Sequence, residues 1–537
     1  MSPKPHENQV IYFQPGQIVF LVAGDSSEAR TGELLSRASK LANDHQHKEV
    51  RMTRKFGLDF RSTLSSDKND KSKESSQENP YFRPEIVSRE SFGLVFTEVE
   101  GITDPDALLD LIISLDKDLK AGPDGPLKVV SPNWLTSGGS QPGATGGPGG
   151  KPTPYIGAAN TTEYIIHPPS KIHDLCKGKE GEGVVVAILD TAPYDPNSGW
   201  PQDANKILDD IYDANPEHSL IKTLLVKENR PLTMFLDQRV QEKSQYITSD
   251  GGKLPWYIEV KGHEYDMTDH GLFVAGIIHS LARKAKLRLY QVLNRYGVGD
   301  LLSVARALQK IVDDLSDNPD TQLVVNLSLT LNTPVELGHS KNNLGGSILG
   351  RDKEWRDRQA WPMEWICDSV YALNSRLIAA AGNDREKGKE RPAARYPAAF
   401  ERVVGVGALP KSETGSSGRR ATASYSNKSD RPARKGITTL GGEEGETDGI
   451  PQGVLGIYLG SFPKSDNNPN PAENKNGWGW WSGTSFATPI ISGITAAVLS
   501  NMPPGTTTEG AIEKLYAAQA ILTDPPDDED VLSVKQG

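Results

Sequence analysis

The 537-residue chain contains only two cysteines, Cys176 and Cys367, and no CxxC spacing. This scarcity argues against a disulfide framework or a cysteine-based zinc site, although a single bridge between the two stays open. No apolar run reaches the roughly 18 residues that a membrane-spanning helix needs. The first residues also lack the basic-then-apolar layout of a secretory signal. We therefore expect a cytoplasmic protein with no membrane partner.

An excess of positive charge is missing as well. The 59 Lys and Arg residues are outnumbered by 70 Asp and Glu residues, which gives a net charge of −11 at pH 7. This balance favours solubility and gives no reason to expect nucleic acid as a partner. The chain is long enough for a large buried core and roughly two to four domains.

A stretch rich in Gly, Pro and Ser divides the chain, since residues 137–154 are SGGSQPGATGGPGGKPTP. No apolar periodicity survives there, so we predict an exposed linker over 137–160. Residues 1–136 are predicted to form a small N-terminal domain. Residues 161–537 are predicted to form one large domain.

Six elements are predicted in the small domain. Strands are expected at 17–24, 49–56, 91–100 and 127–135, and helices at 28–44 and 104–120. The second helix is the most clearly marked, because Asp104 and Pro105 suit its first turn. The order β-α-β-β-α-β is the split-βαβ pattern of a ferredoxin-like α+β domain.

In the large domain, nearly continuous apolar runs alternate with amphipathic stretches. The runs predict strands at 182–190, 285–293, 321–329, 375–383 and 400–409, and the stretches predict helices at 299–315 and 489–502. Strands buried on both faces, with helices between them, indicate a three-layer α/β domain with a mostly parallel sheet. Chemistry gathers at the carboxyl ends of such strands, where Asp190 and Asn383 lie.

The segment SGTSFATP at 482–489 precedes an apolar run. It suits a helix start, because Ser and Thr cap helices and Pro is tolerated in the first turn. The alternative is that Ser485 is a nucleophile, which requires a base, an orienting acid and an oxyanion donor. One candidate exists for each role: His270, Asp190 and Asn383. Each also has an ordinary structural interpretation as a helix-start, cap or turn residue.

The base candidate, His270, begins an apolar stretch that predicts a helix. Thr268 or Asp269 can cap that helix, and the imidazole would project from its first turn. Gly271 permits close approach of another segment to the histidine.

Together these segments resemble the subtilisin-like serine peptidases, or subtilases, in the family's order Asp, His, Asn, Ser. VVVAILDTAP resembles the Asp motif, DHGLFVAGII resembles H-G-T-H-V-A-G, and AAAGND resembles the oxyanion Asn motif. GTSFATP is similar to G-T-S-M-A-T/S-P, and VVNLSL resembles the substrate-binding strand. YPAAFERVVGVGAL and ASYSN match two further family segments. The resemblance spans roughly residues 180–503.

The resemblance implies that Ser485 is the nucleophile, His270 the general base and acid, and Asp190 the residue that orients His270. Asn383 would donate to the oxyanion together with the backbone N–H of Ser485. Family members bind substrate as an extra strand beside two enzyme segments. The matching positions are Gly297, Gly299, Leu301, Ser328, Leu329 and Thr330, with Ala381 and Gly382 lining part of the primary specificity pocket.

The sequence departs from the family pattern at five positions. Ala192 stands where Gly is usual after the Asp-Thr pair, and Leu272 and Phe273 replace Thr and His. Phe486 replaces Met beside the nucleophile. Thr330 stands where Gly is common and should narrow the substrate groove. None of these changes removes a catalytic group, so an active enzyme is expected.

The family's main calcium loop is missing, because GIIHSLARKAKLRLY runs straight through its usual position. We expect no cofactor and no calcium there, while a weaker calcium site elsewhere stays open. Three segments are inserted relative to compact family members, at 190–270, 330–361 and 440–476, and are expected to surround the cleft. The tryptophans of WGWW, residues 478–481, form either an aromatic wall of the cleft or ordinary core.

The N-terminal domain resembles the family's propeptide, since LKVVSPNWL is similar to the closing Pro-Asn-Tyr strand. The resemblance implies an intramolecular inhibitor that is released by cleavage near the linker. A permanent accessory domain that binds a partner is the alternative.

We therefore expect a serine endopeptidase that acts on proteins or peptides and is made as a self-inhibited precursor. A peptide ligase or macrocyclase is a second hypothesis, in which an amine takes the acyl group from Ser485. A catalytically silent binding module is a third, against which the complete set of four residues argues.

Overall fold

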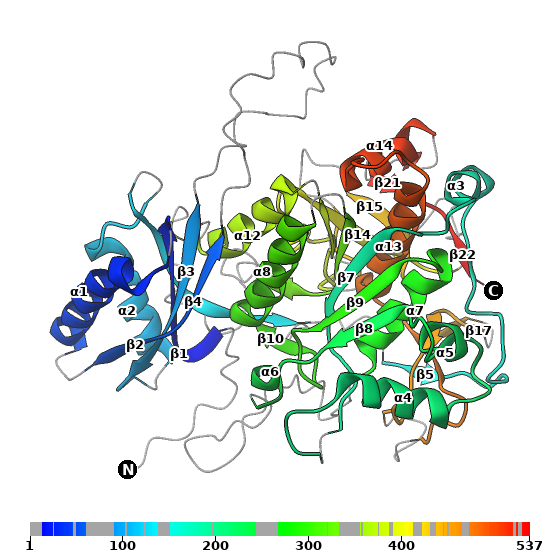
Figure 1. Cartoon of the computed structure of the whole chain (residues 1–537), viewed down its shortest axis with the longest axis horizontal. Coiled ribbons are helices and arrows are strands. Elements are labelled where there is room, and N and C mark those ends of the chain that lie inside the picture. Colours follow the sequence, from blue (N-terminus) through cyan, green and yellow to red (C-terminus); the bar gives the residue numbers. More distant parts are fainter. Residues whose placement is uncertain are drawn as a thin grey trace.

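The computed structural model describes most of the chain. The described residues are 13–24, 26–46, 50–60, 91–102, 105–122, 125–137, 151–195, 198–242, 267–318, 321–331, 355, 358–373, 375–385, 390–411, 422–429, 436–443, 445–447, 450–463, 472–518, 522–524 and 529–536. We call the part up to Ser137 the N-terminal domain and the part from Lys151 the large domain (Figure 1). No helix in these ranges has the length and apolar content that crossing a membrane requires.

The N-terminal domain contains the six predicted elements in the predicted order. They are β1 (Phe13–Ala23), α1 (Glu28–Gln46), β2 (Arg51–Phe60), β3 (Phe92–Glu100), α2 (Pro105–Asp118) and β4 (Leu127–Ser137). The strands lie in the order β4-β1-β3-β2, and all neighbours are antiparallel. Helices α1 and α2 cover the face of this sheet that points away from the large domain (Figure 1). Asp104, predicted to cap α2, lies outside the described residues.

The large domain is built on a nine-stranded sheet in the order β20-β21-β15-β14-β13-β11-β7-β9-β8. The strands are β7 (Val184–Asp190), β8 (Leu232–Phe235), β9 (Lys286–Gln291), β11 (Gln322–Leu327), β13 (Leu377–Ala380), β14 (Val403–Leu409), β15 (Ile437–Leu440), β20 (Leu522–Asp524) and β21 (Glu529–Val531). Every neighbouring pair is parallel except β20 and β21. The predicted mostly parallel sheet is confirmed.

Strand β7 shows why its apolar run is continuous. All seven of its residues are buried. Val185, Ala187 and Leu189 belong to one apolar core, while Val184 and Ile188 belong to the other. Because successive side chains of a strand point to opposite faces, a sheet covered on both sides needs apolar residues at every position.

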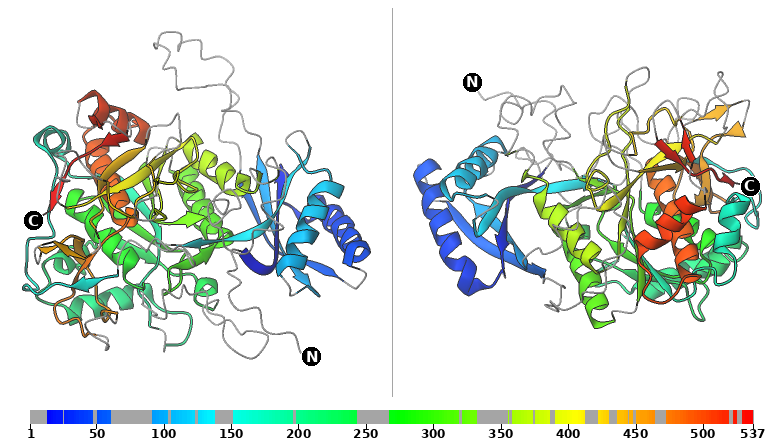
Figure 2. Two further views of the ribbon diagram at one scale, coloured as in Figure 1. Left: turned by 180° about the vertical axis from the view of Figure 1, so that it is seen from behind. Right: turned by 90° about the horizontal axis from the view of Figure 1, so that it is seen from above.

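Helices cover both faces of the sheet and complete three layers (Figure 2). One face carries α3 (Ser170–Cys176), α7 (His270–Leu281), α13 (Thr484–Ser500) and α14 (Thr508–Ala517), and the other carries α8 (Leu301–Asp317) and α12 (Trp361–Ala372). Helix α8 is capped by the Asp300 carboxylate, which accepts the Ser303 N–H at 2.9 Å. The three-layer α/β arrangement predicted from the sequence is therefore confirmed.

Several short elements surround this frame and were not predicted. Between Asp190 and His270 the chain forms α4 (Ala204–Ala214), α5 (Ser219–Leu224) and α6 (Gln238–Glu242), in addition to β8 of the main sheet. Strands β16 (Glu446–Thr447) and β17 (Ile450–Pro451) pair with each other, as do β6 (Ile166–His167) and β22 (Lys535–Gln536). Strand β19 (Trp478–Trp481) pairs with both β18 (Val454–Ile457) and β5 (Thr153–Pro154).

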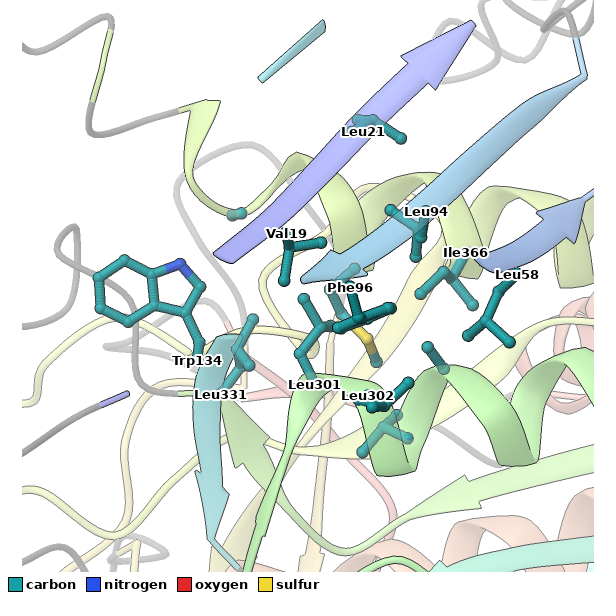
Figure 3. Close-up of a cluster of buried hydrophobic side chains, with 14 of the residues drawn as sticks. Val19, Leu21, Leu58, Leu94, Phe96, Trp134, Leu301, Leu302, Leu331 and Ile366 are labelled. Carbon is teal, nitrogen blue, oxygen red and sulfur yellow. The ribbon is translucent and has the colours of Figure 1, made fainter. Parts of the chain in front are cut away.

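The two domains share a sheet and a core. The last residues of β4 pair with β10 (Val298–Asp300) and with β12 (Thr330–Leu331) of the large domain. The sheet face opposite α1 and α2 packs on α8 and α12. Figure 3 draws part of this core: Val19, Leu21, Leu58, Leu94, Phe96 and Trp134 from the N-terminal domain, and Leu301, Leu302, Leu331 and Ile366 from the large domain.

The segment predicted as linker, 137–160, begins and ends in contact with the large domain. Ser137 is the last residue of β4 and pairs with Val298. Thr153 and Pro154 form β5, and the Tyr155 side chain is buried. Residues 138–150 lie outside the described residues, so the proposed domain boundaries stay a prediction.

Candidate active site

Asp190 and His270 form a buried pair at the carboxyl end of β7. His270 Nδ1 lies 2.7 Å from Asp190 Oδ1, and both side chains are about 1% exposed or less. Asp190 Oδ1 also accepts the Thr191 N–H at 2.7 Å. Its second oxygen, Oδ2, has no hydrogen-bond partner among the described residues. The Oδ1 contact of Asp190 with Nδ1 therefore orients the imidazole ring.

Gly271 allows the pair to form. A Cβ atom at Gly271 would lie 2.1 Å from the Thr191 carbonyl oxygen and 3.1 Å from Asp190 Cβ. Only a residue without a side chain lets the first turn of α7 approach the end of β7 so closely. The Thr191 hydroxyl accepts the Gly271 N–H at 3.0 Å and donates to the Met267 carbonyl at 2.9 Å. Thr191 thus ties the two segments together, a role that sequence reasoning missed.

Asp269 does not cap α7 with its side chain, as the sequence suggested it could. It is the residue before the first helical position, but its carboxylate makes no cap hydrogen bond. Asp269 Oδ2 instead accepts the N–H groups of Leu459 and Gly460 at 2.7 and 2.8 Å. These partners lie about 190 positions away, so no local pattern could reveal them. Asp269 anchors the loop after β18 to the segment that carries His270.

Ser485 is the second residue of α13, which begins at Thr484 rather than near Pro489. Its side chain is buried, and Oγ donates to the Ser328 carbonyl at 3.4 Å, a long hydrogen bond. The Ser328 hydroxyl donates to the Ser485 carbonyl at 2.9 Å and accepts from Asn326 Nδ2 at 3.0 Å. The start of α13 is therefore held against the segment after β11.

Asn383 follows β13 and faces the start of α13. Its Oδ1 accepts both the backbone N–H of Thr484, at 3.0 Å, and the Thr484 hydroxyl, at 2.9 Å. Two donors at one amide atom identify that atom as the oxygen. The Nδ2 group, which can only donate, lies 3.6 Å from the place a Cβ on Gly483 would occupy. Asn383 thus presents a donor beside the residue that precedes Thr484 and Ser485.

Hydrogen bonds from neighbouring segments hold the loop that carries Asn383. Gly382 has a φ of 108°, and a Cβ there would lie 2.7 Å from Asn427 Nδ2. Asn427 accepts the Asp384 N–H at 2.8 Å and donates to the Asp384 carboxylate at 2.9 Å. Arg395 lies 3.5 Å from the same carboxylate. Asn427 belongs to ASYSN, so the sequence marked this segment without showing its role.

The two predicted substrate-binding segments are β10 and β12 with the residues next to them. Gly299 pairs with Thr136 and Thr330 with Ser137, so the end of β4 lies between the two segments as a third strand. A Cβ on Gly299 would lie 2.9 Å from the Thr136 hydroxyl, and one on Gly297 would lie 2.5 Å from Met267 Sδ. An extended chain thus pairs with β10 and β12 at once, and we call the space between these two strands the groove.

The other predicted site residues take different positions. Leu301 begins α8 and is fully buried in the core shared with the N-terminal domain, and Leu329 is also buried. Ala381 is fully buried beside Gly382 and donates its N–H to the Val406 carbonyl at 2.9 Å. These three residues belong to the buried core, so their proposed contact with substrate stays a prediction.

Aromatic side chains pack against His270. The ring of Trp481 meets the imidazole edge to face at 5.3 Å, and the ring of Phe486 lies 5.1 Å from it. Phe273 contacts both rings. Trp478 and Trp480 are also buried, with Trp478 stacked on His218 at 3.9 Å. Of the WGWW segment, Trp481 therefore touches the site, while Trp478 is core.

No group of three His, Cys, Asp or Glu side chains suited to a metal ion occurs in the part of the chain that the structure describes. The arrangement offers a buried carboxylate–imidazole pair, a hydroxyl at a helix start, an amide donor and a strand-binding groove. These are the parts that acyl transfer through a serine requires.

Comparison with known proteins identifies a family and a curated relative. The model of the subtilase family matches residues 181–529, well over half of the chain. Serine protease AprX of Bacillus subtilis (strain 168) is 29% identical over 259 residues, which cover 46% of this chain and 52% of AprX. The chain thus spans about half the length of this relative.

Two solved structures are also similar in part. A lanthipeptide protease matches with a TM-score of 0.40 and 20% identity, over 66% of this chain and 87% of that chain. A protease described as S41 psychrophilic matches with a TM-score of 0.37 and 17% identity, over 67% of this chain and 91% of that chain.

Proposed function

The chain belongs to the subtilase family of serine peptidases, and from this premise we propose that it is a serine endopeptidase that acts through an acyl-enzyme on Ser485. His270 takes the proton from Ser485 Oγ as that oxygen attacks the carbonyl carbon of the scissile bond. Asp190 accepts the Nδ1–H of the imidazolium and stabilises its charge. The proton then passes from His270 to the leaving amine, and water releases the acyl group by the same route.

Asn383 and the backbone N–H of Ser485 are proposed as the oxyanion donors. Thr484 holds the amide oxygen of Asn383 with two hydrogen bonds, which fixes the position of the donor group Nδ2 on the other side of the amide. A fixed donor stabilises the developing negative charge without having to reorient during the reaction. Among the described residues, the Ser485 hydroxyl has one partner, the Ser328 carbonyl, at the end of a long hydrogen bond, so rotation toward His270 costs little. A catalytic hydrogen bond, such as the one that the mechanism needs between Ser485 and His270, often tightens only when substrate is bound.

The observation that carries the endopeptidase proposal is the position of β4. Thr136 and Ser137 pair with both β10 and β12, yet they belong to a chain that continues past this point. A groove that accepts the middle of a polypeptide suits cleavage within a chain. The same contact supports a self-inhibited precursor with a ferredoxin-like propeptide domain, because a substrate cannot enter while β4 occupies the groove.

Polar contacts strengthen the inhibitory docking. Asn133 donates to Asp300 Oδ2 at 2.8 Å and accepts the Leu302 N–H at 3.2 Å. Arg358 on the large domain pairs with the nearly buried Asp116 at 2.8 Å. Buried charge-assisted hydrogen bonds add both affinity and a fixed register. We expect cleavage within residues 138–150 to separate the domains covalently and to leave the N-terminal domain bound at first.

Labelling with a fluorophosphonate tests the nucleophile. We expect wild type, after removal of the N-terminal domain, to be labelled at Ser485, and the His270→Ala variant to be labelled far more slowly. The masses of the products from a reporter peptide separate hydrolysis from ligation, which differ by one water. Labelling at another serine, or a ligated product without hydrolysis, would overturn the proposal.

A further inference from the structure

A cavity of about 980 Å³ lies beside the groove at the boundary between the domains. Its walls come from the carboxyl ends of β8 and β9, from α6 and from the outer side of α8. Phe56, on strand β2, is the lining residue contributed by the N-terminal domain. Cavities of several hundred cubic ångströms are of the size that holds small ligands. The proposed peptidase mechanism makes no use of this cavity.

Two of the residues that line this cavity carry a buried hydrogen-bond donor without an acceptor among the described residues. Gln291 is 3% exposed, and its Oε1 accepts the Asp237 N–H at 3.2 Å, which leaves Nε2 on the other side of the amide. Gln291 Nε2 and Arg239 Nη1 are buried and have no partner among the described residues. Because buried N–H groups without acceptors are costly, the site favours an occupant rich in acceptor oxygens.

The charge of the cavity agrees with this chemistry. Three cations line it: Arg239, Arg306 and Lys310. Two carboxylates offset them, because Arg239 pairs with Asp300 and Arg306 lies 3.2 Å from Asp237. The Lys310 ammonium lies 5.2 Å above the Phe235 ring, with no carboxylate within ion-pair distance in the described part of the chain. The lining residues thus include one cation without a carboxylate partner, Lys310, and two donors without acceptors, Gln291 Nε2 and Arg239 Nη1.

We propose that this cavity binds a small organic anion with two or more carboxylate or phosphate groups. Its oxygens would accept from Gln291 Nε2 and Arg239 Nη1 and would neutralise Lys310. The aromatic rings that line the cavity can pack against an apolar part of the ligand. Carboxylate and phosphate share this recognition chemistry, so the two are separate arms of the test.

Occupation of the cavity is linked to docking of the N-terminal domain. The Phe56 ring lies 5.4 Å from the Arg306 guanidinium and 5.9 Å from that of Arg239, so N-terminal and large-domain groups form one wall. Arg239 also pairs with Asp300, which accepts from Asn133 on β4. The site is complete only in the docked state, and a ligand that binds this state stabilises it by mass action. This consequence rests on the proposed role of the N-terminal domain, whereas binding itself does not.

Titration calorimetry of the full-length Ser485→Ala protein tests the binding. The probes are sodium citrate and sodium pyrophosphate, against sodium chloride at equal ionic strength. We expect saturable binding of at least one probe with a dissociation constant below roughly 1 mM, weakened about tenfold or more in Lys310→Glu. Lys284→Glu, which changes an exposed lysine paired with Glu182 and outside the cavity, should stay within about twofold. The proposed site would be overturned if Lys310→Glu bound the probe as tightly as the protein without this change. It would also be overturned if neither citrate nor pyrophosphate gave more heat of binding than sodium chloride.

Hydrogen exchange on the same Ser485→Ala protein tests the linkage without any catalytic step. At about ten times the dissociation constant, docking is stabilised roughly tenfold, so the amides of β4 should exchange correspondingly more slowly. Phe56→Ala should weaken both the binding and this protection. Saturating anion that leaves exchange in β4 unchanged would overturn the linkage. Because neither experiment needs an active enzyme, failure of the proposed peptidase function would be seen separately.

Discussion

Thr330 and Ser137 face each other across two antiparallel strands, with their hydroxyl oxygens 3.4 Å apart although 193 positions separate them. Both side chains are buried. Thr330 stands in the wall of the groove, so a chain that enters there meets a hydroxyl and a methyl group instead of open backbone. The narrowing expected from the sequence stays a prediction, while the structure shows a polar contact between these two hydroxyls.

Substrate preference should follow from this contact. Peptides with Ser at the position that pairs with Thr330 should be cleaved about tenfold more efficiently in kcat/KM than peptides with Leu, because one net hydrogen bond contributes about 1 kcal/mol and Leu is sterically disfavoured. In Thr330→Gly the ratio should fall to near one. A peptide library varied at that position measures it. An unchanged ratio in the variant would show that Thr330 does not select substrates.

Docking of the N-terminal domain should depend on Asn133. Asn133→Ala removes the donor to Asp300 and leaves the Leu302 N–H at the start of α8 without its acceptor. Loss of these contacts costs about 1–3 kcal/mol, so release of the cleaved domain should be roughly 5- to 150-fold faster. The time course of activity after cleavage measures this. Ser114→Ala, which removes an exposed hydroxyl of α2, is the matched control and should leave the rate unchanged.

Oxyanion stabilisation should depend on Asn383 and, less strongly, on Thr484. Asn383→Ala should lower kcat by about 10²- to 10³-fold and leave KM nearly unchanged, because the donor acts mainly in the transition state. Thr484→Val keeps the backbone N–H but loses the hydroxyl that holds Asn383 Oδ1, so we expect a decrease of about tenfold. Steady-state kinetics on both variants checks this order. Equal losses in the two variants would contradict the separate roles assigned to them.

Acid should destabilise the fold through His218. Its Nδ1 accepts the Ile221 N–H at 3.2 Å and its Nε2 faces the Gly477 carbonyl at 3.1 Å, so only the neutral tautomer with a proton on Nε2 satisfies both. Burial is the main cause that lowers the pKa of His218 to about 4 from its ordinary 6.5. The unfolded chain binds a proton first as pH falls. The contribution of His218 to the free energy of unfolding is therefore fully present above about pH 6.5. It is lost progressively toward pH 4, and the loss is on the order of 3 kcal/mol.

Denaturant unfolding between pH 7 and 4 measures this loss. His218→Asn can still cap α5 without titrating, so its stability should fall less steeply with decreasing pH. His279, whose pKa burial also lowers to about 4, keeps part of the slope in the variant. His173→Asn, at an exposed site on α3, should match wild type. If His218→Asn were as acid-sensitive as wild type, protonation of His218 would not be the cause.

The sequence predicted the frame of the fold because its signals are local. The apolar run of β7 follows from burial on both faces, and the order of elements in the N-terminal domain follows from periodicity and helix-start residues. The elements between Asp190 and His270 were missed, since α4, α5 and α6 are short and owe their stability to packing rather than to a strong pattern.

Contacts between distant segments were beyond prediction from residue patterns. Asp269 looked like a helix cap, but its partners Leu459 and Gly460 are brought near only by the fold. Thr153 and Pro154 looked like part of a linker, yet they pair with β19 more than 300 positions later. The pairing of Asp190 with His270 was expected from a family resemblance, and the 2.7 Å distance agrees with it.

Intact-mass spectrometry of wild type and Ser485→Ala, produced side by side, tests the central claim most directly. Because Ser137 pairs with Thr330 and the nearby Ser328 carbonyl accepts from Ser485, we expect the bond that is cut to lie shortly after Ser137, within residues 138–150. We predict that wild type separates into two fragments within this segment and that Ser485→Ala stays whole. A Ser485→Ala protein cut at the same bond to the same extent would contradict the account, because the cleavage would then owe nothing to Ser485.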